Sequence, residues 1–243
     1  MTPHVDDRGE DGIPVSASLV TVVGNPRPGS RTLQAAVAAT AAIAARIGHP
    51  VPDGRDPGDV VDLSGLAPHL FAPEPAPQLE AAVKLVTGAS VLVVASPTYK
   101  GTYTGLLKAF LDRLPPDALA GTVALPLLVM GHARHSLAVE VHLRPLLVEL
   151  GATVPTPGLA LLESDLPELD GVLAGWADRV APQVAAALGG GEAAPAAYPG
   201  AFTAALLGNL ALAVVTLCLL PLLLRGSAVT ARRTAAAPEP SAR

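Results

Sequence analysis

Hydrophobic and polar positions are grouped in blocks along residues 18–187. Short, continuously apolar runs recur, and each is followed by a longer amphipathic or alanine-rich stretch. The first pattern is typical of a buried strand and the second of a helix. We expect strands over 19–24, 60–63, 91–96, 123–130 and 153–162. We expect helices over 32–47, 76–87, 105–114, 136–150 and 167–188.

The expected strands and helices alternate, which gives five βα units in a row. Because the strands are apolar throughout, both of their faces must be buried, as in a parallel sheet covered by helices on each side. Pro126 falls inside the fourth strand, although proline suits a strand start better than a strand interior. Ligands of such sheets bind beyond the carboxyl ends of the strands. The loops after Gly24, Ser96 and Met130 are therefore the candidate sites.

The two ends of the chain have a different character. Residues 1–17 are polar and acidic, have no apolar stretch of the kind a signal peptide needs, and are expected to be a disordered tail. Residues 188–200 are rich in Gly, Ala and Pro, as in a flexible linker. Residues 226–243 are again expected to be a disordered tail.

Residues 201–225 form a nearly uncharged apolar segment. No Asp, Glu, Lys or Arg occurs between Glu192 and Arg225, and the run is long enough to cross a bilayer core of about 30 Å. Gly208 and Pro221 are tolerated in a membrane helix. We expect a transmembrane helix, and the alternative is a buried oligomerisation helix.

Composition narrows the function classes further. The formal net charge of −5 argues against a nucleic-acid-binding protein, which usually carries a basic surface. A single cysteine, Cys218, rules out an intrachain disulfide, and Cys/His spacing typical of zinc sites is absent from the sequence. Half of the residues are hydrophobic but only 3% are aromatic, so the core must be built from Ala, Val and Leu.

The first candidate loop has the sequence GNPRPGSRT, residues 24–32. It has the glycine spacing of a Walker A loop, but Ser30 stands where that loop needs its lysine. A helix that starts here would offer free N–H groups to one phosphate. Ser30 and Thr32 would add hydroxyl groups, and Arg27 and Arg31 positive charge. The alternative is a plain turn in which a hydroxyl side chain caps the helix.

The second candidate loop begins the sequence SPTYKGTYTGLLKAFLDRLP, residues 96–115. Pro97 fixes the backbone as the chain leaves the sheet. Tyr99 offers a flat apolar face with a polar end, and Gly101 allows the backbone to approach a ligand closely. Together these residues suit a planar ligand.

Two other groups of polar residues are expected to have no catalytic or metal-binding role. The sequence places together His132, His135, Glu140 and His142, but no zinc-protease motif is present and one helix does not bring all four to one face. We expect a solvated polar loop and no metal. Asp112 and Arg113 are expected to be exposed charges at a helix end rather than an acid and a base.

The first and second loops together resemble those of the NADPH-dependent FMN reductase family, in particular the reductases of two-component alkanesulfonate monooxygenase systems. The resemblance covers residues 18–165 and implies a flavodoxin-like three-layer α/β sandwich. It implies that the FMN phosphate binds at Ser30–Thr32 and the flavin ring beside Pro97–Gly101, with a third contact at Gly131, where many members have a Gly-Gly pair. The implied cofactor-binding residues are Asn25, Arg27, Ser30, Arg31, Thr32, Pro97, Thr98, Tyr99, Lys100, Gly101 and Gly131.

The resemblance also implies an activity. NADPH or NADH would transfer hydride to FMN, and the reduced flavin would supply a partner monooxygenase. No side chain needs to act as a general acid or base, because the cofactor carries the chemistry. A homo-oligomer is implied, and Tyr103 matches an aromatic residue that forms a π-bulge at a subunit interface in such reductases. The alternative for Tyr103 is simple packing at the start of a helix.

Two other functions remain open. One is a membrane-tethered flavodoxin-like electron carrier, and the other is a quinone or azo reductase that retains its FMN. The expected localisation is a cytoplasmic domain, residues 18–187, that the segment 201–225 attaches to the cell membrane.

Overall fold

A computed structural model describes residues 18–48, 59–74 and 76–189, all within the first of two compact units, Met1–Gly191. Five strands form one sheet in the order β2-β1-β3-β4-β5, and every neighbouring pair is parallel. This is the doubly wound order of flavodoxin-like folds, and it confirms the expected five-stranded parallel sheet. The strands are β1 (Leu19–Val23), β2 (Asp59–Asp62), β3 (Val91–Pro97), β4 (Val123–Met130) and β5 (Leu159–Leu162).

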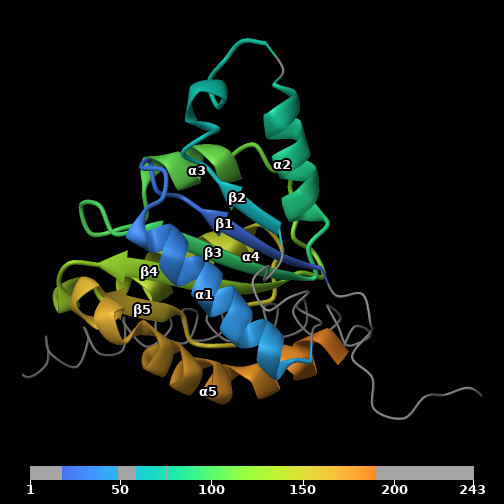
Figure 1. Ribbon diagram of the computed structural model, residues 1–243. Coiled ribbons are helices and arrows are strands. Elements are labelled where there is room, and N and C mark those ends of the chain that lie inside the picture. The colour runs from blue at the N-terminus through green and yellow to red at the C-terminus, as the bar shows by residue number, and fades with distance from the viewer. Residues whose placement is uncertain (1–17, 49–58, 75, 190–243) are drawn as a thin grey trace, which may run out of the picture. The chain divides into compact units, whose positions relative to one another are not determined.

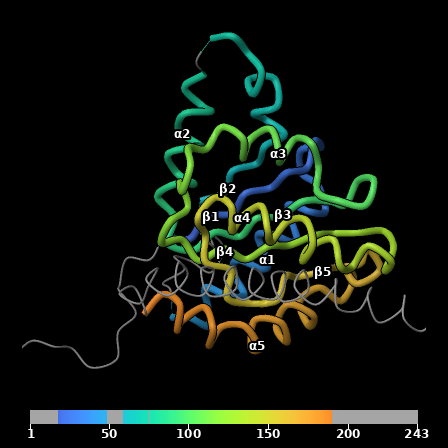
Figure 2. The backbone as a smooth tube through the Cα atoms, turned by 180° about the vertical axis from the view of Figure 1, so that it is seen from behind, coloured from blue at the N-terminus to red at the C-terminus, as the bar shows by residue number. Residues whose placement is uncertain are grey.

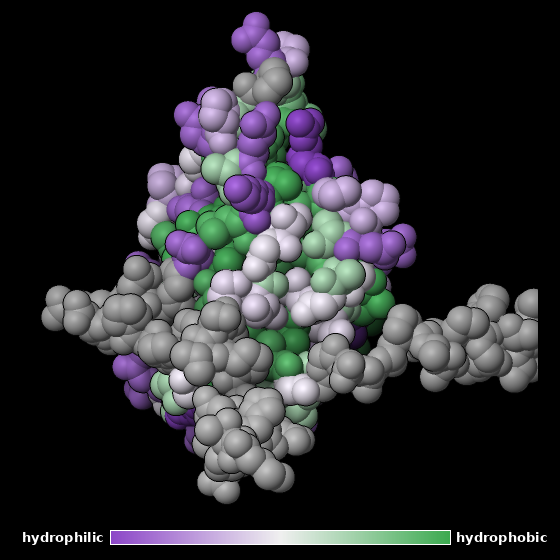
Figure 3. Space-filling view, turned by 90° about the vertical axis from the view of Figure 1, so that its right-hand side faces the viewer, coloured by the Kyte–Doolittle hydropathy of each residue, from purple (hydrophilic) through white to green (hydrophobic). Residues whose placement is uncertain are grey.

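Helices cover both faces of the sheet (Figures 1 and 2). One face packs on α1 and α5, and the other on α2, α3 and the helical segment around α4. All of β3 is buried: Leu92 and Val94 belong to one core, whereas Val91 and Val93 belong to the other. The α-helices are α1 (Arg31–Arg46), α2 (Pro77–Thr87), α3 (Gly105–Leu111), α4 (Arg144–Glu149) and α5 (Leu169–Gly189). Hydrophilic side chains gather around the α2 end of the domain, with hydrophobic ones on the surface beside them (Figure 3).

Pro126 lies in the middle of β4, a position that suits proline less well than the start of a strand. The Ala124 N–H donates to the Thr153 carbonyl, on the β5 side of the strand. Two residues further along, the nitrogen of Pro126 points to the same side. The β4–β5 ladder resumes only at Leu127, which pairs with Leu159. The side of Pro126 that lacks an N–H therefore faces the stretch between Thr153 and Leu159, where β4 and β5 do not pair.

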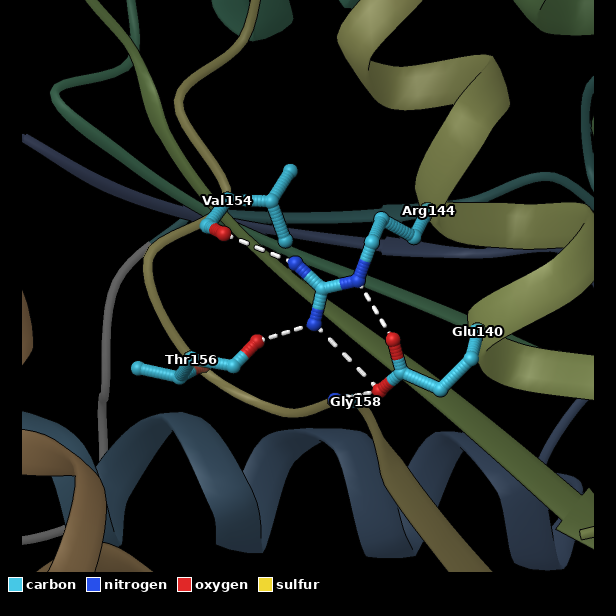
Figure 4. Close-up of polar contacts among 5 residues, drawn as sticks. All are labelled: Glu140, Arg144, Val154, Thr156 and Gly158. Carbon is cyan, nitrogen blue, oxygen red and sulfur yellow. Dashed lines mark hydrogen bonds and ion pairs between the residues drawn. The ribbon is translucent and has the colours of Figure 1, made fainter. Parts of the chain in front are cut away.

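The last expected strand is correspondingly shorter than residues 153–162. Thr153 makes an isolated parallel bridge with Val123, and the strand itself starts at Leu159. Between them, Arg144 donates hydrogen bonds to the carbonyls of Val154 (2.7 Å) and Thr156, and Glu140 accepts one from the Gly158 N–H at 2.5 Å (Figure 4). The ion pair between the side chains of Glu140 and Arg144 therefore holds residues 154–158, which do not belong to the sheet.

The expected helix over 136–150 is the largest departure from the sequence prediction. The segment consists of a 3₁₀ turn (Ala133–His135), a π-helix (Val139–Leu143) and only then α4. The expected π-bulge at Tyr103 is wrong, since Tyr103 lies in the connection before α3. The π-helix occurs instead at Val139–Leu143, next to the contacts that Glu140 and Arg144 make with residues 154–158.

Other boundaries shift by a few residues. The helix expected over 105–114 ends at Leu111, and the last helix begins with a 3₁₀ segment, Glu163–Glu168, before α5. Because α5 extends to Gly189, residues 188 and 189 belong to this helix rather than to the expected linker. The expectations for residues 1–17, 190–200, 201–225 and 226–243 lie outside the described residues. Within the described ranges, no helix is long and apolar enough to span a membrane.

Candidate functional site

Three loops follow the carboxyl ends of β1, β3 and β4, which are neighbours in the sheet. Parallel strands bring these ends to the same edge. The loops after β3 and β4 project together on the left-hand side of Figure 1. The three segments singled out from the sequence therefore lie at one edge of the domain.

The first loop is held close to α3. The Gly24 N–H donates to the Ala95 carbonyl at 2.8 Å, which aligns the start of the loop with β3. A Cβ at position 24 would lie 2.5 Å from Leu107 Cβ, so only glycine fits. Gly29 has φ +62°, a left-handed conformation, with no atom within 4 Å of its would-be Cβ. The two glycines thus serve different purposes, close packing and a turn.

Asn25 organises the inside of this loop. It is only 7% exposed; its Oδ1 accepts a hydrogen bond from the Arg27 N–H at 3.0 Å, and its Nδ2 donates to Thr32 Oγ1 at 3.1 Å. Thr32 is itself buried, at 2% exposure. These two residues therefore shape the loop from within, while Arg27 is exposed at its surface.

Ser30 and Arg31 already have protein partners. Ser30 Oγ accepts a hydrogen bond from the Leu33 N–H at 3.2 Å and so caps α1. Arg31 forms an ion pair with Glu163 at 3.0 Å, with both side chains about half exposed. The capping alternative for Ser30 is thus realised, but its hydroxyl hydrogen remains available to donate. An exposed ion pair is weak, so Arg31 can also serve another anion.

The second loop is a tight hairpin. Tyr99 and Thr102 exchange backbone hydrogen bonds of 2.9 and 3.3 Å around Lys100 and Gly101. Both central residues have positive φ, +56° for Lys100 and +86° for Gly101, as a type I′ turn requires. Tyr99 is 44% exposed on this hairpin. A lysine in a left-handed conformation is uncommon and is the kind of local strain that occurs at functional sites.

Thr98 carries an unpaired hydroxyl at the base of the hairpin. Its N–H donates to the Val129 carbonyl at 2.8 Å, but its buried Oγ1 has no hydrogen-bond partner in the structure. Pro97, the preceding residue, is buried at the end of β3. A buried hydroxyl without a partner is costly, so a polar ligand atom at this position would be favoured.

Thr104 connects the first two loops, and the sequence analysis missed it. Its hydroxyl donates to the Gly24 carbonyl at 2.5 Å and accepts from the Leu107 N–H at 3.1 Å. Its own N–H donates to Ser96 Oγ at 3.0 Å. The signal was present: a threonine directly before an expected helix is a typical N-cap.

The third loop is exposed and carries basic side chains. It contains Gly131, His132, Arg134 and His135, and His132 Nδ1 accepts a hydrogen bond from the Arg134 N–H at 3.3 Å. Among the described residues there is no cluster of three or more His, Cys, Asp or Glu side chains suited to a metal ion. Glu140, weighed as a possible ligand, instead pairs with Arg144.

The groups along this edge are chemically suited to anion binding and to hydrogen bonding. Arg27, Arg31 and Lys100 are exposed, and α1 starts at this edge. The Thr98 hydroxyl has no hydrogen-bond partner. Larger cavities lie elsewhere, about 540 Å³ beside α2 and about 600 Å³ beside α5. A smaller one of about 270 Å³ touches Arg31 and Glu163.

Comparisons with known proteins agree with this fold. The family model described as NADPH-dependent FMN reductase matches residues 17–165. An FMN reductase (NADPH) of Escherichia coli K12 is 42% identical over 93 residues, which is 37% of this chain and 49% of that one. Another from Pseudomonas aeruginosa PAO1 is 35% identical over 152 residues, 60% of this chain and 77% of that one. The chain thus spans about half the length of the first relative.

A solved structure extends the comparison to three dimensions. The apo form of an NADH:FMN oxidoreductase (EMOB) superimposes with a TM-score of 0.60 at 33% identity, covering 68% of this chain and 89% of that one. The likeness therefore extends over most of the solved chain.

Proposed function

This chain belongs to the NADPH-dependent FMN reductase family, and from that premise we propose that it transfers a hydride from NADPH or NADH to FMN. The observation that carries the proposal is the meeting of the first and second loops, which Thr104 joins directly through Gly24. One loop begins a helix, and the other ends a buried strand with an unpaired hydroxyl. A ligand with a phosphate at one end and a polar planar ring at the other suits this pair of loops.

Each residue has a defined task in this proposal. The N-terminus of α1, the Ser30 hydroxyl and the Arg31 guanidinium would bind the FMN phosphate. Asn25 and Thr32 shape the loop from inside, so they would support the phosphate site rather than cover it. Arg27 lies at the loop surface, where it adds positive charge.

The second loop would hold the flavin ring. The hairpin backbone from Pro97 to Gly101 and the Thr98 hydroxyl offer hydrogen bonds to its polar edge, and Tyr99 offers an apolar surface. Gly131 would approach from the third loop. FMN held here would supply the hydride-accepting chemistry, so these residues would need to supply position and electrostatics rather than a proton donor.

The direct test uses the full chain. FMN is titrated and followed by absorbance, and oxidation of NADPH and of NADH is then measured at 340 nm. We expect saturable FMN binding and FMN-dependent oxidation of one or both nucleotides. The proposal is wrong if the folded protein neither binds FMN nor oxidises either nucleotide.

The nearly uncharged segment 201–225 favours a second candidate. We propose that it attaches the reductase to a membrane, with the catalytic domain in the cytoplasm, since so long an uncharged run is typical of a spanning helix. Fractionation of cells that express the full chain or a chain without 201–225 tests this, and equal solubility of the two contradicts it. A tethered electron carrier would bind FMN tightly without oxidising NAD(P)H. A quinone or azo reductase would retain FMN and reduce quinone faster than free flavin.

The proposed fate of the reduced flavin is delivery to a partner monooxygenase, in a homo-oligomeric reductase. Reduced FMN that leaves the protein can be trapped by a flavin-dependent monooxygenase in a coupled assay. Size-exclusion chromatography with light scattering measures the oligomeric state.

A further inference from the structure

The loop after β5 reaches the same edge as the three candidate loops. Every strand of the sheet is parallel to its neighbours, so the carboxyl end of β5 lies with those of β1, β3 and β4. The chain leaves β5 through the 3₁₀ segment Glu163–Glu168, and Asp165 Oδ2 accepts a hydrogen bond from the Leu162 N–H at 3.0 Å. This contact fixes the turn and places Glu163 directly after the strand. The sequence analysis assigned no role to this loop.

Glu163 contacts the start of α1. Its Oε2 atom lies 3.0 Å from Nη2 of Arg31, the first residue of that helix. The positive end of a helix dipole lies at the N-terminus, so an arginine there is unfavourable unless an anion neutralises it. The structure describes α1 over its whole length, and its first turn has no acidic residue. Glu163 therefore supplies, from another part of the chain, the negative charge that this helix end lacks.

The other end of α1 provides a comparison. Arg46, the last residue of the helix, pairs with Asp178 of α5 at 2.9 Å. A cation is favoured at a helix C-terminus, so Arg46 needs no anion to offset the dipole. At a rise of about 1.5 Å per residue, the two arginines lie roughly 20 Å apart along α1. Of these two pairs, only that of Arg31 lies at the edge proposed to bind the flavin phosphate.

The ion pair between Arg31 and Glu163 can open. The Arg31 side chain is 62% exposed and that of Glu163 is 47% exposed. Beside them lies the cavity of about 270 Å³, whose walls also include Gln34 and Leu166. An ion pair so exposed contributes little to stability, whereas a charge-assisted hydrogen bond to a phosphate is a strong one. A phosphate at this helix end can therefore bind Arg31, but it must compete with Glu163 to do so.

We propose that Glu163 competes with the flavin phosphate for Arg31, so that FMN binds as an exchangeable substrate rather than as a tightly held group. A phosphate gains Arg31 only by breaking the ion pair, and the released carboxylate then repels it. The phosphate therefore adds less to the affinity than the helix end and the arginine would give alone. This inference rests on the proposed function, because it places the FMN phosphate at α1.

The test compares FMN with riboflavin, which is the same flavin without a phosphate. Flavin fluorescence titration of the full chain gives both dissociation constants for the unmodified protein and for Glu163→Gln. We expect the preference for FMN over riboflavin to increase about threefold to tenfold in the variant, with riboflavin affinity unchanged. Dissociation of FMN, followed by stopped-flow fluorescence, should be correspondingly slower.

A matched variant and salt separate this role from a general effect of charge. Asp178→Asn removes the carboxylate that pairs with the other α1 arginine, and it should leave both flavin affinities unchanged. The gain in Glu163→Gln should shrink between about 0.05 M and about 0.5 M NaCl, because salt screens exposed charges. Circular dichroism confirms that both variants are folded.

The outcomes distinguish this inference from the proposed function. If the preference for FMN over riboflavin in Glu163→Gln is no greater than in the unmodified protein, the inference is overturned and the flavin site stands. An equal increase in Asp178→Asn overturns it as well, since Glu163 would then have no specific role. If the unmodified protein binds neither flavin, the proposed function itself is wrong.

Discussion

The Thr104 hydroxyl donates a hydrogen bond to the backbone carbonyl of Gly24, a residue 80 positions earlier in the chain, at 2.5 Å. The same oxygen caps α3 through the Leu107 N–H. One buried side chain thus fixes the first candidate loop to the helix that follows the second. The two parts of the proposed flavin site are held together by it.

Replacing Thr104 with valine should therefore disturb both stability and FMN binding. The change keeps the shape but leaves the Gly24 carbonyl and the Leu107 N–H unpaired. We expect the free energy of unfolding to fall by about 2–3 kcal/mol, from a lost cap and an unsatisfied buried group. Urea denaturation measures this. Thr104→Ser, which keeps the hydroxyl, should lose much less, and an equal loss would contradict the role of the hydrogen bonds.

Gly24 and Gly29 should respond differently to alanine. At Gly24 the new Cβ would lie 2.5 Å from Leu107 Cβ, so backbone must move, at a cost of about 1–3 kcal/mol. At Gly29 there is free space, and only the left-handed φ is penalised, by about 1 kcal/mol. Thermal denaturation of the two variants gives the order. Greater damage at Gly29 would show that the approach to Leu107 is unimportant.

Replacing Arg31 should weaken FMN binding, whereas replacing its partner Glu163 should not. Arg31→Gln removes a charged partner for the proposed phosphate and should weaken FMN binding about tenfold. Glu163→Gln removes the competing carboxylate and should leave affinity unchanged or increase it. Absorbance titration of both variants tests this. Weaker binding in Glu163→Gln would mean that the ion pair itself holds the site in shape.

Replacing Lys100 with asparagine should leave the stability of the fold unchanged or higher but weaken nucleotide binding. Lys100→Asn creates the Asn-Gly pair that a type I′ turn favours, so stability should stay the same or rise by about 0.5 kcal/mol. The lost positive charge should weaken binding of FMN or of the nicotinamide nucleotide, and Lys100→Arg should retain it. Asp117→Asn is the control, because Asp117 is the other described non-glycine residue with positive φ, +55°, outside the candidate loops. Unchanged binding in Lys100→Asn would remove Lys100 from the site.

Glu140 should make stability depend on pH. Its hydrogen bond with Arg144, together with that from Gly158, lowers its pKa below the ordinary value of 4.5. A carboxyl group with a lowered pKa stabilises the fold above its unfolded-state pKa, and this contribution is lost as pH falls through the folded-state value. The gap in unfolding free energy between wild type and Glu140→Gln should therefore be constant above about pH 6 and shrink below about pH 4.5. A gap independent of pH would contradict it.

The sequence predicted the sheet well because burial on both faces leaves a strong local signal. The Val123–Met130 strand matches its prediction at both ends, even with Pro126 inside it. The sequence did not predict that β5 begins only at Leu159, because the start of β5 depends on which strand faces the nitrogen of Pro126. The π-turn at Val139–Leu143 likewise depends on a tertiary contact, the grip of Glu140 and Arg144 on the next segment.

The common edge of the three candidate loops was predicted from the sequence, but the contacts among their residues were not. The three loops do meet at one edge, as strand order requires. The Arg31–Glu163 pair joins residues 132 positions apart, and no local sequence pattern predicts such a contact. Asn25 and Thr32 were selected as ligand-binding residues, yet they bond to each other inside the loop. Polarity located the loop, but only the fold shows which polar groups face outward.

Pro126 also has a consequence for the shape of the cavity beside α5. Because this residue cannot donate a hydrogen bond toward β5, residues 154–158 gain little by joining the sheet, and the Arg144 guanidinium takes their carbonyls instead. Pro157 and Gly158, at the end of that detour, form part of the wall beside Trp176. A single imino acid inside the sheet thus lets side-chain contacts rather than strand pairing shape this wall, at the edge opposite the candidate flavin loops.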